Sequence, residues 1–302
     1  MEQYGSNVDP NDLLIFAYVA ELGSFSRAAE RLGMPKSSVS RHLAALEDRL
    51  GERILLRTTR RQTLTEFGRL LLEHARQVVA EVDAVAALSE HRQAAPSGRL
   101  RVSMPSDFAN LLLADALAAF VATYPSINLE LDLSPRRVDL LGEGFDVAVR
   151  VGDLPDDTLL AARRLSELST GLYASAGYLA AAGNPASPEA LARHNAVGLL
   201  GLNGEAVRWR LDNGESRWEG PPPARLTANS PELLIRMARA GAGIAAVPDA
   251  FALPDVRKGL LQRVLPDWCL PRETVSAVFP GRKLMPVKTR AFLDMLQATL
   301  GA

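Results

Sequence analysis

Residues 24–64 read SFSRAAERLGMPKSSVSRHLAALEDRLGERILLRTTRRQTL, and this stretch decides the fold of the first part of the chain. Ser24 is a suitable N-cap for a first helix, and Gly33 can end that helix in the left-handed conformation. A second helix follows and stops at Gly51. The apolar residues of this second helix, spaced four, three and four apart, are Val39, Leu43, Leu46 and Leu50. Such spacing predicts one buried helix face.

Two helices joined by a short glycine-containing turn are typical of a helix-turn-helix, whose second helix lies in a major groove. The alternative is an ordinary helical hairpin with a solvated polar face. Charge favours DNA, because residues 24–64 contain nine Lys or Arg against four acids, while the remaining chain has 25 against 31. Positive charge concentrated on one segment suits phosphate binding. The residues expected to contact base edges or adjacent phosphates are Lys36, Ser37, Ser38, Ser40 and Arg41.

A basic hairpin follows the second helix. Two short extended runs, 54–56 and 62–64, flank a basic tip and predict a wing of two strands. Arg60 is expected to enter a minor groove, where arginine responds to groove width as well as charge. Arg57 and Arg61 are expected to contact phosphates. Before the motif, a helix that starts at an Asp9 cap would close a three-helix core.

A long helix is predicted after the wing. Thr65 can cap it, and the helical pattern continues to about Ser89. Its apolar residues recur at 4-3-4-3 spacing and are Leu71, Ala75, Val78, Val82 and Val85. A helix of roughly 25 residues is about 37 Å long, and its heptad seam would be exposed unless another helix covered it. We therefore expect dimerisation through this helix, with packing against its own domain as the alternative.

Length and composition restrict the class of protein. The chain has 302 residues, 47% hydrophobic and 23% charged, which predicts two or three globular domains. A single cysteine, Cys269, cannot form an internal disulfide and fits a reducing compartment. The start MEQYGSNVDPNDLL does not resemble a signal peptide, and no run of eighteen uncharged apolar residues predicts a membrane span. These features predict a cytoplasmic protein.

Beyond the linker-like residues 92–98, strands alternate with helices, which predicts α/β units with a mostly parallel sheet in two small lobes. Strands are expected at 99–104, 127–133, 146–151, 171–174, 195–199, 208–211, 225–227, 244–247 and 274–279. Helices are expected at 108–123, 138–142, 176–182, 188–193, 231–240 and 286–300.

Several kinds of enzyme and metal site are not supported. Residues 241–246, GAGIAA, satisfy a dinucleotide-binding pattern, but they follow a helix and lead into a strand, the reverse of the required order. Their glycines are interpreted as turn residues. The four histidines have no metal-ligand spacing. A nucleophile elbow and a Walker loop are absent from the sequence. No cofactor, metal or catalytic residue is therefore predicted.

The order of helix-turn-helix, wing, long helix and α/β region resembles LysR-type transcriptional regulators from Asn11 to the C-terminus. The residues that carry the resemblance are Phe16, Val19, Gly23 to Ser26, Ala28, Ala29, Leu32, Val39 to Arg41, Leu43, Leu46, Glu47, Leu50, Gly51, Leu64, Thr65, Gly68, Tyr124, Pro125, Asp146 to Arg150, Gly241, Gly243 and Ile244. Many members have Ser-Gln-Pro where this chain has Pro35-Lys36-Ser37, which leaves the capping and base preference of the recognition helix open.

The resemblance implies a winged helix-turn-helix domain over 1–66, a linker and dimerisation helix over 67–91 and a hinge over 92–98. It also implies an effector domain over 99–302, built like a periplasmic binding protein. Lobe I would comprise 99–162 and 270–302, and lobe II 163–269, with a small ligand between them.

The function implied is that of a ligand-responsive transcription regulator, dimeric through the linker helix and tetrameric through its effector domains, with RNA polymerase as a partner. Its operator would be an interrupted palindrome with T and A at its ends, near its own promoter or a divergent one. The alternatives are a solute-binding protein, which would need export, and an effector-independent DNA-binding repressor. Target genes, effector, direction of regulation and the choice between a dimer and a tetramer or higher oligomer stay open.

The effector site is expected at the C-terminal ends of strands 99–104, 146–151 and 225–228, where open α/β sheets bind ligands. Helix N-termini there favour anions, so a small organic acid, aromatic acids included, is the expected ligand class. Asp107 opposes a highly charged anion unless it points away or caps its own helix. Arg150 could pair with a ligand carboxylate or with an acid such as Asp153. The candidate residues are Pro105, Ser106, Asp107, Ser134, Pro135, Arg150, Asn229, Ser230, Val247 and Pro248.

Overall fold

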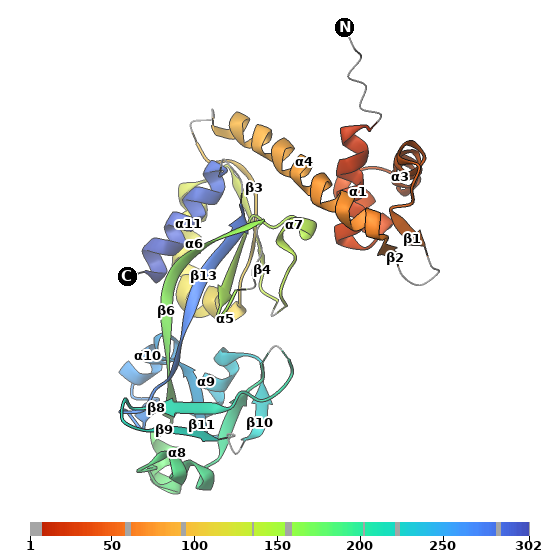
Figure 1. Ribbon diagram of the computed structural model, residues 1–302. Helices are drawn as coiled ribbons and strands as arrows, with labels where there is room; N and C mark the ends of the chain where they lie inside the picture. The colour runs from red at the N-terminus through yellow and green to blue at the C-terminus, as the bar shows by residue number, and fades with distance from the viewer. Residues whose placement is uncertain are drawn as a thin grey trace. The chain divides into compact units, whose positions relative to one another are not determined.

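A computed structural model describes residues 8–57, 62–91, 95–134, 136–154, 159–201, 203–220, 224–281 and 285–301. These residues belong to two compact units (Figure 1). The first unit comprises the described residues of Met1–Pro96 together with those of the short segments Asp139–Phe145 and Gly281–Val287. The second unit comprises the remaining described residues.

Three helices form the core of the first unit, as the sequence predicts. They are α1 (Pro10–Leu22), α2 (Phe25–Leu32) and α3 (Lys36–Leu50). The Ser24 side chain caps α2 by accepting a hydrogen bond from the Arg27 amide at 3.4 Å. Gly33 ends α2 in the left-handed conformation, with φ of 64°. The largest fully buried side chains of this core are Phe16, Leu43, Leu46 and Ile54.

The wing and the long helix complete this unit. Strands β1 (Leu55–Arg57) and β2 (Gln62–Leu64) pair in antiparallel fashion, and α4 follows over Glu66–His91. The Thr65 hydroxyl accepts from the Gly68 amide at 2.9 Å and donates to the Arg53 carbonyl at 2.8 Å. One side chain therefore caps α4 and fixes its start against the wing.

Described strands in the second unit form one nine-stranded mixed sheet and a separate two-stranded sheet. The large sheet contains β3 (Gly98–Ser103), β4 (Ile127–Asp132), β5 (Val147–Val151), β6 (Leu160–Ala174), β7 (Ala196–Leu199), β10 (Ala224–Ala228), β11 (Ile244–Pro248), β12 (Gln262–Val264) and β13 (Leu270–Pro280). The small sheet pairs β8 (Trp209–Asp212) with β9 (Arg217–Gly220).

Helices flank these sheets. They are α5 (Ser106–Phe108), the π-helical turn η1 (Ala109–Leu113), α6 (Ala114–Thr123), α8 (Ala176–Ala182), the 3₁₀ helix η2 (Pro188–Arg193), α9 (Pro231–Arg239), α10 (Asp249–Arg257) and α11 (Val287–Leu300). A further short helix, α7 (Leu140–Glu143), is grouped with the first unit.

Two long strands run through both halves of the large sheet. Strands β6 and β13 lie side by side and antiparallel along most of their length (Figure 1). Strands β5, β3 and β4 follow β13 in the sheet, whereas β11, β7 and β10 follow β6. We use lobe I for the β3–β5 half with α5, η1, α6 and α11, and lobe II for the half that contains β7–β12 and α8–α10.

Elements that the sequence did not predict have identifiable reasons. The sheet is mixed rather than mostly parallel, because the crossing strands β6 and β13 are antiparallel to each other. Most of β6 was missed, since its first part is half-exposed and rich in charge. Helix α10 was missed because Pro254 lies inside it, and proline removes a helical hydrogen bond. The strands β9 and β12 are short and were also missed.

The segment Ser106–Thr123 is long and apolar enough to cross a membrane by length and composition alone. In the structure it comprises α5, η1 and α6 rather than one regular helix. Its residues Leu113, Leu117 and Phe120 are buried, and Phe120 meets Phe292 of α11 edge to face at 5.3 Å. These contacts are those of a helix packed in a protein core.

Candidate functional site

Helix α3 separates an exposed polar face from a buried one. Lys36, Ser37 and Arg41 are exposed, and Ser38 and Ser40 are half-buried. Residues Val39, Leu43 and Leu46, on the opposite face, have no exposed surface. The predicted DNA-contacting residues of this helix therefore share one accessible surface.

Helix α3 begins at Pro35-Lys36-Ser37, where many LysR-type regulators have Ser-Gln-Pro. Pro35 is the N-cap, and in the described part of the chain no side chain caps this helix. The Pro35 carbonyl accepts from the Ser38 and Val39 amides at 2.9 and 3.2 Å. The backbone N–H groups of the first helical turn therefore donate to no described side-chain oxygen. A helix N-terminus of this kind is suited to binding a phosphate.

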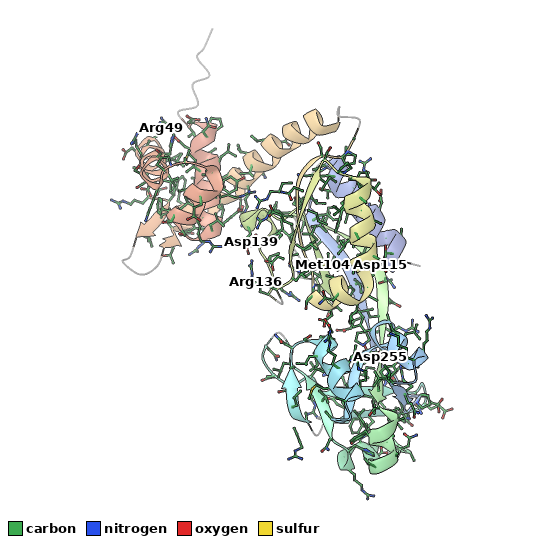
Figure 2. The ribbon with its side chains drawn as sticks, turned by 180° about the vertical axis from the view of Figure 1, so that it is seen from behind. Arg49, Met104, Asp115, Arg136, Asp139 and Asp255 are labelled. Atoms are coloured by element: carbon green, nitrogen blue, oxygen red, sulfur yellow. The ribbon has the colours of Figure 1, made fainter. Side chains whose placement is uncertain are left out.

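A buried acid fixes α3 against α1. Asp12 is 1% exposed and accepts hydrogen bonds from His42 Nδ1 and Arg49 Nη1, each at 2.6 Å. Arg49 lies on α3 (Figure 2). Sequence reasoning missed this group, although an acid among apolar helix positions is the signal that could have revealed it. The pairs set the orientation of the polar face.

The wing is tied to the end of α3 as well. Glu47 Oε1 accepts from the Ile54 and Leu55 amides at 3.0 and 3.3 Å, so the last turn of α3 positions β1. The backbone of Arg57 ends β1. The Arg57 side chain and the whole of Arg60 and Arg61 lie outside the described residues.

The apolar residues of the predicted heptad seam on α4 do not all lie on one exposed face. Ala75 is fully buried in the core of its own unit and Leu71 packs against that core, so the prediction that Ala75 faces a partner helix is wrong. The small alanine lets α4 approach the other helices closely. Val78 is half-buried and Val82 is 48% exposed. The Val85 side chain lies outside the described residues.

A salt bridge ties α4 to α1. Arg76 Nε lies 2.8 Å from Glu21 Oε1, whose side chain is 6% exposed. Burial raises the pKa of Glu21, and the hydrogen bond and charge of Arg76 oppose that rise. This pair links the linker helix to the first helix of the domain.

Lobe I contains a half-buried arginine close to other cations. Arg150 Nη1 donates to Ser103 Oγ at 3.3 Å and to the Val149 carbonyl at 3.1 Å, while its buried Nη2 has no hydrogen-bond partner among the residues that the structure describes. Burial lowers the pKa of Arg150, the charges of Arg137 and Arg136 lower it further, and the charge of Asp132 opposes them. Among the described residues Arg150 forms no ion pair, so the pairing with Asp153 that the sequence left open is not formed. Ser103 was not predicted.

The side chain of Asp132 lies in the same region. The Ser134 amide donates to Asp132 Oδ1 at 2.8 Å, and Arg136 lies 3.2 Å from Oδ2. The hydroxyl and amide of Ser134, with Arg136, hold the pKa of Asp132 below its usual range. Arg136 therefore forms an ion pair with Asp132, whereas Asp132 acts on Arg150 through its charge and, among the described residues, forms no ion pair with it.

Asp107 joins lobe I to lobe II. The residue is 5% exposed, and its carboxylate accepts from the Ser230 hydroxyl at 3.1 Å and the Glu232 amide at 2.7 Å. Ser230 is also the N-cap of α9 and accepts from the Leu233 amide at 3.4 Å. Asp107 therefore caps a helix of the opposite lobe and not its own helix, a role that the sequence did not predict.

The remaining predicted effector residues are dispersed. Pro105 and Ser106 begin α5, and Asn229 is exposed just before α9. Val247 is fully buried in the lobe II core, so its predicted place in a ligand wall is wrong. Pro248 is half-buried and begins α10. Pro135 lies outside the described residues.

The glycine-rich run at 241–246 forms a turn between α9 and β11, in the helix-to-strand order expected from sequence. Gly241 has a φ of 85°. A Cβ at Gly243 would lie 2.4 Å from the Asn195 carbonyl oxygen. These glycines therefore serve backbone geometry, which confirms their interpretation as turn residues. In the described part of the chain, His, Cys, Asp and Glu form no cluster of three that could hold a metal ion.

Comparison with known protein families gives two matches. Residues 10–69 match the bacterial regulatory helix-turn-helix protein of the lysR family, and residues 93–301 match the LysR substrate binding domain. An HTH-type transcriptional regulator of Xanthomonas campestris is 38% identical over 97% of this chain and 86% of its own length. The regulator PtxR of Pseudomonas aeruginosa is 37% identical over 98% of this chain and 94% of its length.

Solved structures agree with these matches. The structure of CrgA, a LysR-type transcriptional regulator from Neisseria meningitidis, has a TM-score of 0.63 and 33% sequence identity, covering 98% of this chain and all of CrgA. Full-length AphB, a virulence activator of Vibrio cholerae, has a TM-score of 0.62 and 27% identity, covering 97% of this chain and all of AphB.

The two family matches together cover both units of the chain, and the relatives align over nearly its whole length. An N-terminal helix-turn-helix with a basic exposed face and a mixed α/β substrate-binding domain are the two parts that define this family. Its members regulate transcription and are not enzymes. The chain belongs to the LysR-type transcriptional regulators, DNA-binding proteins with an effector-binding domain.

Proposed function

We propose that this regulator reads its operator with the first half of α3 and with the wing. The observation that carries this proposal is the shared accessible face of Lys36, Ser37 and Arg41, opposite a fully buried face. Arginine is the usual reader of guanine, and lysine and serine contact phosphates. Ser38, Ser40, Arg57, Arg60 and Arg61 complete the proposed set.

The proposed operator is an interrupted palindrome with T and A at its ends, near the protein's own promoter or a divergent one. A dimer places two recognition helices in major grooves about one helical turn, or a multiple, apart. We propose that the C-terminal half of α4, with Val78, Val82 and Val85, forms the dimer contact, and the exposure of Val82 supports this. Effector domains would join dimers into tetramers, and RNA polymerase would be a partner in the cytoplasm.

The effector we propose is a small organic acid bound between lobes I and II. Its support is Arg150, whose buried Nη2 has no hydrogen-bond partner among the described residues. The charges of Arg137 and Arg136 act on the same guanidinium, and the nearby carboxylate that opposes them, Asp132, is already bonded to Arg136. A buried donor without an acceptor costs free energy, and a ligand carboxylate would supply the acceptor. Ser103 would hold the guanidinium in place for that contact.

DNA binding is tested by footprinting and gel shift on fragments that flank the gene. Arg41→Ala is compared with the wild type and with Arg239→Ala, which removes an arginine from α9 outside the proposed contact. We expect a protected site that Arg41→Ala weakens and Arg239→Ala does not. Equal binding by all three proteins would contradict the assignment of α3.

Effector binding is tested by a thermal-shift screen of small carboxylic acids on the full-length protein, because a ligand raises the melting temperature by mass action. Arg150→Gln should abolish the shift given by an acid that stabilises the wild type, whereas Arg150→Lys should retain part of it. Ser106→Ala and Asn229→Ala test the two helix starts. An acid that stabilises all these variants equally would bind elsewhere, and no response to any acid would favour an effector-independent repressor.

A further inference from the structure

We propose that Asp107 is a built-in occupant of the anion position at the N-terminus of α9, and that it latches lobe I to lobe II until a ligand carboxylate displaces it. The displacement by an effector rests on the function proposed above. The latch itself rests only on the contacts that Asp107 makes in the structure.

The donors around Asp107 are those that bind free anions at helix ends. Glu232 contributes a backbone N–H from the first turn of α9 at 2.7 Å, and Ser230 contributes a hydroxyl at 3.1 Å. Helix α9 has nine residues and begins with Pro231. Its dipole places partial positive charge where the carboxylate lies. Asp107 therefore fills the anion position at the start of α9, where a second acidic group of the ligand, besides the one at Arg150, could bind.

Two further contacts join the same short segment of lobe I to lobe II. Asn110 Nδ2 donates to Glu232 Oε2 at 3.0 Å. The rings of Phe108 and Phe251 meet edge to face, with centroids 5.5 Å apart. One polar and one apolar contact between the lobes therefore lie beside the contact of Asp107.

The latch segment has an unusual backbone. Asp107 and Phe108 belong to α5, and Asn110 belongs to the π-helical turn η1 that separates α5 from α6. Single π-helical turns are uncommon and often occur at functional positions. Here the π-helical turn lies between α5 and α6. The three contacts with lobe II described above all come from this segment, residues 107–110.

The latch would also couple ligand binding to the contact between lobes I and II. A ligand carboxylate that reaches α9 has to exchange with Asp107, because both use the same N–H and hydroxyl donors. Exchange releases the carboxylate that holds lobe I to α9. Ligand binding would then be coupled to a change in how the lobes are held, through differential contacts in the two states.

Chemical rescue with formate tests the latch on the full-length protein. Asp107→Ala removes the carboxylate and leaves an opening about the size of formate at α9. We expect the effector-domain transition in calorimetry to fall by about 2–6 °C. Sodium formate at about 100 mM should then restore about 2–4 °C, in comparison with sodium chloride at the same ionic strength.

Asp115→Ala is the matched control, because Asp115 is an exposed acid in the first turn of α6, in the same lobe (Figure 2). This variant and the wild type should show no comparable response to formate. Should Asp107→Ala not accumulate as folded protein, Asp107→Ser leaves a similar opening and the same response is expected.

Three results would overturn the latch. They are an unchanged transition in the Asp107 variant, a lowered transition that formate does not restore, and an equal formate shift in variant, control and wild type. The experiment contains neither effector nor DNA. Its failure is therefore distinct from a failure of the proposed effector, which the acid screen reports.

Discussion

Gly68→Ala should loosen the joint between the wing and the linker helix. Gly68 lies in the first turn of α4, and a Cβ built there would be 2.1 Å from the Ile54 carbonyl oxygen and 3.1 Å from the Thr65 hydroxyl oxygen. Real Cβ atoms do not approach an oxygen more closely than about 3 Å, so the backbone has to move by about an ångström. The Ile54 amide is held by Glu47, and the Gly68 amide by Thr65. Neither side of the contact can move without losing a hydrogen bond.

The cost follows from this geometry. Overpacking alone costs about 1–3 kcal/mol, and a weakened cap adds roughly 1 kcal/mol. In a domain of 60–100 residues each kcal/mol lowers the melting temperature by about 4–8 °C. Gly68→Ala should therefore lower the DNA-binding-domain transition by about 8 °C or more. It should also weaken operator binding, because Ile54 directly precedes β1 of the wing.

Calorimetry on the full-length protein measures the two transitions, and gel shift measures binding. Gly177→Ala is the control, since a Cβ at Gly177 meets nothing within 4 Å and the residue lies inside helix α8. Alanine there should leave stability unchanged or raise it by about 0.4–1 kcal/mol. A Gly68→Ala protein that melted with the wild type and gave its footprint would refute the close contact with Ile54.

Further predictions concern DNA, assembly and pH. Arg41→Ala should weaken specific binding by about 10-fold or more in gel shift, since a lost base contact costs about 1–3 kcal/mol; an intact footprint would count against it. Arg60→Ala should reduce binding to operators with A·T-rich flanks more than to those with G·C-rich flanks, and an equal loss would exclude groove reading. Val82→Asp should shift the mass measured by light scattering toward the monomer, because Val82 is exposed on α4. Burial raises the pKa of Glu21 from its usual 4.5, so the wild type should gain stability relative to Glu21→Gln as the pH falls from neutrality toward 4.5, and parallel pH profiles in calorimetry would contradict this.

The sequence by itself determined the recognition motif. Its signals are local: Ser24 and Gly33 set the ends of α2, and the 4-3-4 spacing in α3 places one face in the core. Caps, turn glycines and helical periodicity depend on residues a few positions apart. The same local signals predicted the helix-to-strand turn at Gly241–Gly243, because the preceding residues read as a helix.

Only the tertiary structure decided which distant groups meet. Asp12 pairs with residues 30 and 37 positions away, and Asp107 bonds to the N-cap and the first turn of α9, 123 and 125 positions away. Ala75 reads as a heptad position but is buried by its own domain. An acid or a small apolar residue has the same local pattern whether its partner is solvent, another lobe or a second chain. The packing of the whole domain selects that partner, because burial and hydrogen bonding depend on groups that sequence neighbours do not specify.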